Sequence, residues 1–182
     1  MISKQTSACK YYLTRSRCWR TLYCRRSLVI ASEFPEEAKV IRAARLRNDS
    51  MPGKVAEEII RLMKGLDMPN IACLGASYKG NIGDTRNSPA LEIYQKLQGE
   101  QGESLQVVLH DNHIDNSRFS TQSLDSAVKD ASLFVVLVDH EEYKSIDPYT
   151  IGKMVHRKCI LDTRNLLNHQ EWRSSGFEVH VL

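Results

Sequence analysis

Short apolar runs alternate with helical segments in the second half of the chain. The runs are rich in β-branched residues and too short for helices, which is typical of buried strands. They are NIACLG (70–75), LQVVLHD (105–111), SLFVVLVDH (132–140), KCILDTRN (158–165) and FEVHVL (177–182). Strands joined by helical crossovers predict an α/β fold, a Rossmann-like doubly wound parallel sheet of about five strands. The most β-branched run, 132–140, is expected to be the central strand, covered on both faces.

The predicted helices differ in length. Residues 88–98, 123–130 and 147–156 form short helices that connect the strands. Residues 34–66 form a longer helical segment, in which Met51, Val55, Ile59 and Leu62 make one apolar stripe. Pro52 either kinks this segment or starts a second helix with Ser50 near its cap. The expected organisation is therefore a tail (1–33), a joining helix (34–66) and a sheet domain (67–182).

Basic charge is concentrated at the N-terminus. The chain has 182 residues with 25 basic and 22 acidic side chains. Seven of the basic residues and none of the acidic ones lie in residues 1–28. The net charge of +3 therefore describes this tail, which we expect to be disordered, and not the sheet domain. A targeting peptide or a nucleic-acid-binding arm would share this composition.

Cysteine and histidine spacing gives no sign of a metal site. None of the five cysteines pairs with another at the short spacing of a zinc site, and the six histidines are expected to be structural or on the surface. Cys73 and Cys159 fall in predicted strands, where a thiol is usually a small buried apolar group. Without a secretory signal or an apolar run near 18 residues, we expect a cytoplasmic protein with reduced thiols and no membrane contact.

Charged side chains follow the predicted strands. Because ligands of doubly wound sheets bind beyond the carboxyl ends of the strands, these positions are the candidate site. They are Tyr78, Lys79, Asp84 and Arg86 after the first strand, Asp111 and His113 after the second, Asp139 and His140 after the third, and Asp162 and Arg164 after the fourth. Two guanidinium groups, an ammonium group and a helix N-terminus at Ser88-Pro89 favour an anionic ligand, most simply a nucleotide diphosphate.

Other interpretations of these charges stay open. Asp84 and Arg86 could form a salt bridge that braces the loop, and Arg164 could be a solvated charge at a strand end. The stretch G-A-S-Y-K-G is neither a Walker A loop nor a G-x-G-x-x-G motif, so neither ATP nor an ordinary Rossmann cofactor is indicated by motif.

The stretch GASYKGNIGDTRNSPALEI (75–93) resembles a motif of the UDP-glucose/GDP-mannose dehydrogenase family, approximately G-x-x-F-K-x-x-T-x-D-x-R-x-S-P-A. RAARLRNDSMP (42–52), LVDHEEYKSID (137–147) and LDTRNLL (161–167) resemble other segments of that family. The resemblance covers about residues 34–182. It is strongest to the members that oxidise UDP-N-acetyl-D-mannosamine in bacterial surface-polysaccharide synthesis.

The resemblance implies roles for four residues. Tyr78, where the family usually has Phe, and Lys79 would contact the UDP-sugar, and Arg164 would bind the substrate. Arg86 would reach the NAD cofactor. Ile82 replaces the motif threonine. The helix at 36–64 would form a homodimer interface.

Two family features are not found in this sequence. The G-x-G-x-x-G motif of the NAD domain and the G-G-x-C motif of the catalytic cysteine are both missing, so no catalytic residue is assigned. Permitted codons for Cys18–Leu28, read one base later, can encode Val-Gly-Gly-His-Cys-Ile-Ala-Val-Asp-Pro-Trp. The hypothesis is that residues 1 to about 29 are a frame-shifted reading of the gene, which its DNA sequence would test.

Two functions are therefore considered. In the first, the chain is the C-terminal fragment of an NAD-dependent nucleotide-sugar 6-dehydrogenase and is inactive alone. In the complete enzymes, the resemblance implies that a cysteine holds the thiohemiacetal and thioester intermediates. Alternatively, the chain is a non-catalytic module that binds UDP or forms a dimer.

Overall fold

The computed structural model describes residues 29–67, 69–100, 105–115 and 118–182. The prediction of a disordered tail (1–33) and the frame-shift hypothesis rest mainly on residues 1–28, which lie outside these ranges. Residues 29–33 of the predicted tail are helical, which corrects that part of the prediction. The chain divides into two compact units, one that ends at Ser50 and one that begins at Met51. Each is described by itself.

The described part of the first unit is helical. Residues 29–33 form a short helix and α2 spans Lys39–Asp49. Ser50 is the C-cap of α2, and its N–H donates to the carbonyl groups of Leu46 and Arg47. No residue of α2 is buried, and Val40 is 81% exposed. A hollow of about 440 Å³ lies between residues 31–35 and α2.

The second unit begins with helix α3 (Met51–Met63), so a second helix starts beside Pro52 rather than continuing through a kink. Val55 and Ile59 are buried against the sheet, as the apolar stripe predicts, and Leu62 is partly buried. Met51, at the start of the predicted stripe, is 37% exposed, and Met63, outside it, is buried instead. Pro52 is tolerated in the first turn because the N–H groups there have no intrahelical partner.

Five parallel strands form one sheet, which confirms the predicted fold class. They are β1 (Asn70–Leu74), β2 (Gln106–His110), β3 (Leu133–Val136), β4 (Cys159–Asp162) and β5 (Glu178–Val181). Their order is β2-β1-β3-β4-β5, and every neighbouring pair is parallel. The central strand is β3, as expected, and all four of its residues are buried.

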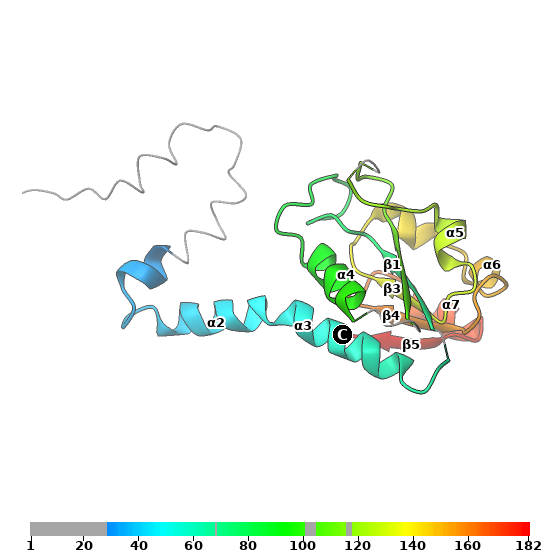
Figure 1. Ribbon diagram of the computed structural model, residues 1–182, viewed down its shortest axis with the longest axis horizontal. Coiled ribbons are helices and arrows are strands. Elements are labelled where there is room, and N and C mark those ends of the chain that lie inside the picture. The colour runs from blue at the N-terminus through cyan, green and yellow to red at the C-terminus, as the bar shows by residue number, and fades with distance from the viewer. Residues whose placement is uncertain (1–28, 68, 101–104, 116–117) are drawn as a thin grey trace, which may run out of the picture. The chain divides into compact units, whose positions relative to one another are not determined.

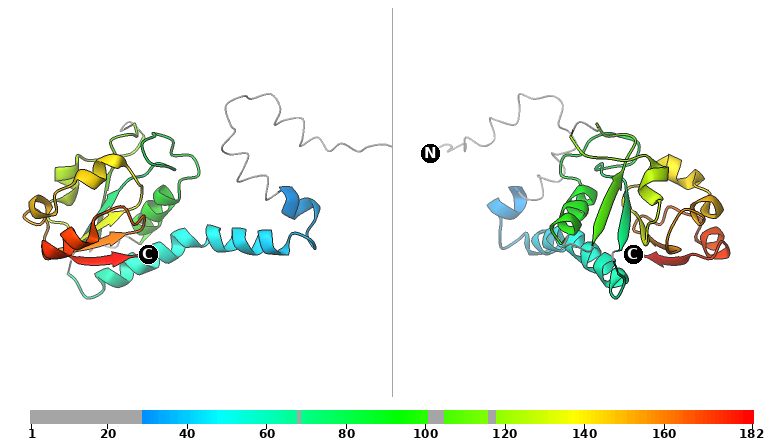
Figure 2. Two further views of the ribbon diagram at one scale, coloured as in Figure 1. Left: turned by 180° about the vertical axis from the view of Figure 1, so that it is seen from behind. Right: turned by 45° about the vertical axis from the view of Figure 1, so that its right-hand side comes forward.

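Helices cover both faces of the sheet (Figures 1 and 2). Helices α3 and α4 (Pro89–Gly99) pack on the face that carries Ile71 and Cys73. The opposite face, with Ala72 and Leu74, packs against α5 (Leu124–Val128), α6 (Pro148–Ile151) and α7 (His169–Ser174). This alternation follows from the two-residue period of a strand. Among the described residues, no helix is both long and apolar enough to span a membrane.

The structure differs from the sequence prediction after β3. Strand β3 covers only part of the apolar run at 132–140 and ends at Val136. The residues after it lie against the loop that follows β1, where Val138 faces Gly75 and the Asp139 carbonyl faces Gly80. The predicted helix at 147–156 is limited to α6, which ends at Ile151 with Gly152 as its C-cap. A 3₁₀-helix, η2 (Glu141–Ser145), and helix α7 were not predicted, since five and six residues are too few for a clear helical period.

Candidate functional site

The candidate site is a small hollow where the strand order reverses. From β1 the chain crosses to β2 on one side, and the following crossover returns past β1 to β3 on the other. This is the topological switch point of a 2-1-3-4-5 sheet, where ligands of such folds bind. The hollow has a volume of about 40 Å³, and it is lined by Ser77, Tyr78, Pro89, Ala90, Leu137, Val138, Asp139 and Arg164.

The loop that follows β1 packs closely against its neighbours. A Cβ atom at Gly80 would overlap the carbonyl oxygen of Asp139, and one at Gly83 would overlap that of His113. Only glycine allows these two approaches. The loop at 75–88 is therefore seated on the segments that follow both β2 and β3.

Helix α4 points its N-terminus at the hollow. Ser88 is the N-cap, and its hydroxyl accepts from the N–H of Leu91 while donating to the carbonyl of Ser77. Pro89 occupies the first turn and lines the hollow with Ala90. The positive end of the helix dipole therefore faces this space, which favours an anion there.

Arg164 reaches the hollow from the end of β4. Its backbone N–H donates to the carboxylate of Asp162, and its Nη2 lies 3.3 Å from Oδ1 of Asp139. Burial tends to raise the pKa of Asp139, but its hydrogen bonds and the Arg164 charge outweigh this effect and lower that pKa. An ion pair thus links the segments that follow β3 and β4.

Arg86 does not line this hollow. Its Nε and Nη2 donate to the two carboxylate oxygens of Asp84 over 2.9 and 2.7 Å. The two residues form the loop-bracing salt bridge that the sequence left open. The Asp84 carbonyl also accepts from the N–H of Tyr78 over 2.7 Å, so this pair belongs to the turn that presents Tyr78 and Lys79.

A buried carboxylate holds the same loop from beneath. Asp111 Oδ2 accepts from the N–H groups of Ala76 and Ser77 over 2.8 and 3.2 Å and lies 3.3 Å from Nε2 of His140. Asp111 Oδ1 accepts from the N–H of His113. Burial opposes ionisation, but the bonds from His140, Ala76 and His113 prevail and lower the pKa of Asp111 to about 2.

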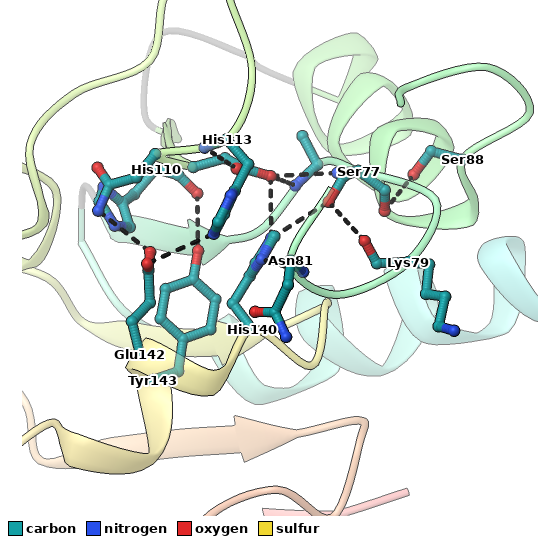
Figure 3. Close-up of polar contacts among 12 residues, drawn as sticks. Ser77, Lys79, Asn81, Ser88, His110, His113, His140, Glu142 and Tyr143 are labelled. Carbon is teal, nitrogen blue, oxygen red and sulfur yellow. Dashed lines mark hydrogen bonds and ion pairs between the residues drawn. The ribbon is translucent and has the colours of Figure 1, made fainter. Parts of the chain in front are cut away.

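His140 is fully buried in this network (Figure 3). Its Nδ1 accepts from the N–H of Asn81 over 3.0 Å, so the neutral ring carries its proton on Nε2. From there it can donate to Asp111 or to the Ser77 hydroxyl, 3.1 Å away. The ring stacks on that of His113, with centroids 4.4 Å apart.

Ser77, His140 and Asp111 do not form a nucleophilic triad. A triad uses the two ring nitrogens on opposite sides, one toward the hydroxyl and one toward the carboxylate. Here Nε2 contacts both groups, while Nδ1 is occupied by a backbone N–H. The arrangement therefore orders backbone and does not activate the serine.

One further group lies on the α3 side of the sheet. Ligand atoms of Cys159, Glu178 and His180 lie within 4.8 Å of one another, although sequence spacing gave no sign of this because two neighbouring strands bring them together. Glu178 already bonds to Arg157 over 2.8 Å and to His180 over 2.9 Å. Burial raises the pKa of the Cys159 thiol to about 11. The Glu178 carboxylate is thus already engaged by Arg157 and His180, and the Cys159 thiol is poorly suited to ionise, so this group is a hydrogen-bonded cluster and not a candidate metal site.

The structure thus brings together some of the residues predicted from sequence. Tyr78 and Arg164 line one hollow, and Lys79 is exposed beside Tyr78. Asp111, His140 and Asp162 were noted only as residues at strand ends. Asp111 and Asp162 share a pattern, an acid that follows or ends a strand, which could have suggested carboxylates that accept backbone N–H groups. The partners Ala76 and His140 of Asp111 lie too far along the chain for spacing to reveal.

The strand order and the helices on both faces define a doubly wound α/β domain with a hollow at its switch point. Comparison with known proteins identifies its family. Residues 72–169 match the model of the UDP-glucose/GDP-mannose dehydrogenase family, UDP binding domain. The chain therefore belongs to this family.

Individual relatives agree with this assignment. The chain is 41% identical over 153 residues to a UDP-N-acetyl-D-mannosamine dehydrogenase of Methanocaldococcus jannaschii. The aligned region covers 82% of this chain and 35% of that relative. A UDP-N-acetyl-mannosamine dehydrogenase structure from Staphylococcus aureus matches 84% of this chain and 35% of its own, with 32% identity and a TM-score of 0.72. A UDP-D-ManNAc dehydrogenase structure from Pyrococcus horikoshii covers 87% of this chain and 37% of its own, with 29% identity and a TM-score of 0.74. The chain spans about a third of the length of these relatives.

Proposed function

We propose that this chain binds the UDP part of a UDP-sugar at the switch-point hollow. The observation that carries the proposal is that Tyr78 and Arg164, from loops 86 residues apart, line one hollow at the N-terminus of α4. The guanidinium group and the helix dipole would receive phosphate oxygens, and Lys79 would add a point charge. The phenol ring of Tyr78, 39% exposed, offers a face to the base or sugar.

The size of the hollow limits the expected affinity. A volume of about 40 Å³ holds a few water molecules or one phosphoryl group, so most of a nucleotide would lie on open surface. We therefore expect weak binding, with a dissociation constant of about 0.1 to 1 mM.

Titration calorimetry of the full chain with UDP tests this function. Arg164→Ala and Lys79→Ala are each expected to weaken binding about tenfold, by loss of a charge-assisted contact. Arg61→Ala is the matched control, since Arg61 also pairs with an acid on the surface but lies on α3. No heat of binding at millimolar UDP would overturn the proposal, as would equal weakening by all three substitutions.

We further propose that the chain is the C-terminal part of an NAD-dependent enzyme that oxidises UDP-N-acetyl-D-mannosamine to the uronate. The similarity to named dehydrogenases supports this substrate. Arg86 is the residue proposed to reach NAD, and its side chain is 69% exposed beside Asp84. When bound, NAD would accept the hydride, and this chain would hold the UDP end of the substrate. We propose that the chain alone is inactive, which an NAD-reduction assay with UDP-N-acetylmannosamine tests; turnover would contradict it.

A dimerisation module is the second candidate. The apolar stripe of α3 is already covered by the chain's own sheet, whereas α2 exposes Val40 and Leu46, 81% and 63% respectively. We therefore propose that α2 contributes the homodimer surface. Sedimentation should show that Val40→Glu with Leu46→Glu weakens self-association. Asn48→Glu adds the same charge at an exposed position on another side of the helix and should have little effect. A monomeric native chain at all concentrations would contradict this.

A further inference from the structure

Two buried carboxylates occupy equivalent places on either side of the hollow. Asp111 follows β2 and Asp162 ends β4, and these two strands flank the β1–β3 pair at which the hollow lies. Both carboxylate side chains are fully buried. Each accepts backbone N–H groups of a ligand-facing loop and contacts one histidine Nε2.

The first pair, Asp111 and His140, holds the loop that carries Tyr78 and Lys79. Asp111 receives the N–H groups of the two residues before Tyr78, and His140 receives that of Asn81, two residues after Lys79. The three residues between Ser77 and Asn81 are thus held at both ends. Neither side chain lines the hollow itself.

The second pair, Asp162 and His169, holds the loop that carries Arg164. Asp162 Oδ1 accepts from the N–H of Arg164 over 2.9 Å. Asp162 Oδ2 accepts from the N–H groups of Leu166 and Leu167 over 2.8 and 3.0 Å and lies 2.9 Å from Nε2 of His169. The backbone of Arg164 is thus held by Asp162, while its side chain pairs with Asp139.

These bonds have consequences for ligand affinity. A loop that must be ordered during binding loses conformational entropy at that moment, whereas a loop ordered beforehand does not. Buried N–H groups that lose their acceptor also favour loop conformations that reach water. An acid–histidine pair therefore affects a ligand that it never touches.

We propose that Asp111–His140 and Asp162–His169 are two positioning pairs, which pre-order the Tyr78–Lys79 loop and the Arg164 loop from opposite sides of the hollow and thereby set the affinity for UDP. The identity of the ligand rests on the proposed function. The ordering of the loops does not, so the two can be tested apart.

Amide hydrogen exchange and UDP calorimetry on the full chain test the pairs. Asp111→Asn should accelerate exchange at Ala76 and Ser77, and Asp162→Asn at Leu166 and Leu167. Each should weaken UDP binding about tenfold. Asp147→Asn is the matched control: Asp147 also accepts backbone N–H groups, those of Tyr149 and Thr150, but caps α6 and does not line the hollow. It should accelerate exchange locally and leave UDP affinity unchanged.

Substitutions of His140 separate hydrogen bonding from packing. His140→Phe keeps a ring for the stack on His113 but has no donor or acceptor, whereas His140→Gln keeps one of each. We expect Phe to release the amide of Asn81 and weaken UDP binding as much as Asp111→Asn, and Gln to restore part of both. These variants also serve if Asp111→Asn does not fold.

The outcomes are distinct. Unchanged loop exchange in the Asp111 and Asp162 variants, or native behaviour of His140→Phe, would overturn the inference. Faster loop exchange with unchanged UDP affinity would overturn it as well and leave the proposed function intact. If the native chain binds no UDP, the proposed function fails, and the exchange data alone decide whether the pairs order the loops.

Discussion

Arg164 and Asp139 form an ion pair over 3.3 Å although both line the hollow proposed for an anion. Both side chains are more than 40% exposed. Any phosphate that reaches the guanidinium group there competes with a carboxylate already in place. The pair holds Arg164 near the hollow but also places a negative charge beside the expected ligand.

Removing that charge should strengthen ligand binding. We predict that Asp139→Asn raises the affinity for UDP about two- to fivefold, since exposed ion pairs contribute about 0.2 to 1 kcal/mol and the repulsion of phosphate is also lost. Calorimetry at low and high salt measures the change, which should shrink as salt screens the repulsion. Weaker binding by this variant would instead mean that Asp139 is needed to orient Arg164.

Acid should remove the contribution of Asp111 to stability. Its pKa is about 2 in the folded chain and about 3.9 when unfolded. The unfolded state therefore binds more protons between these values, and about 2 kcal/mol of stability, fully present above pH 4, is lost as the pH falls toward 2.

Urea denaturation of the native chain and of Asp111→Asn, at several pH values from 7 to 2, measures this effect. The two free energies of unfolding should differ most above pH 4 and converge below it. A difference that does not change with pH would show that the carboxylate contributes through shape and not through charge.

Helix α3 should behave as part of the sheet domain. Ile59 has no exposed surface and packs in the core beneath the sheet, whereas the neighbouring Ile60 is 39% exposed. Ile59→Ala is predicted to cost about 2 to 4 kcal/mol of unfolding free energy, and Ile60→Ala less than about 0.5 kcal/mol. Equal costs in chemical denaturation would contradict the packing of α3 described above.

The strand cysteines should resist alkylation. Burial raises the pKa of Cys73 to about 12, so its thiolate, the reactive form, is almost absent at pH 8, and the sulfur has no exposed surface. Iodoacetamide should label Cys73 and Cys159 in urea but not in buffer, as read by mass spectrometry of their peptides. Rapid labelling of Cys73 in buffer would show that the sheet opens readily.

The sequence predicted the sheet more completely than the site. Apolar runs such as 105–111 indicate parallel strands, because a strand covered by helices on both faces is apolar throughout. Once the strands are located, the charged residues at their ends can be read directly from the sequence. The same logic placed Tyr78 and Arg164 on one edge. Local rules also offered the Asp84–Arg86 bridge as one of two open interpretations, because its partners are only two residues apart.

The rest depends on contacts between distant segments. Nothing near Asp111 indicates that His140 and Ala76 will surround it, since 29 and 35 residues separate them. The early end of β3 also involves a distant segment. The apolar residues Leu137 and Val138 suggest a longer strand, but Val138 packs against Gly75 of the loop after β1.

Gly80 and Gly83, which lie against the carbonyl groups of Asp139 and His113, determine which substitutions the loop after β1 can tolerate. Gly83 is exposed to solvent, and a tolerance scan guided by exposure would rank it among the freely replaceable positions. Its Cα instead lies against the His113 carbonyl with no room for a methyl group. In a library of surface variants, positions 80 and 83 should be depleted as strongly as buried leucines, and alanine should be no better accepted there than tryptophan.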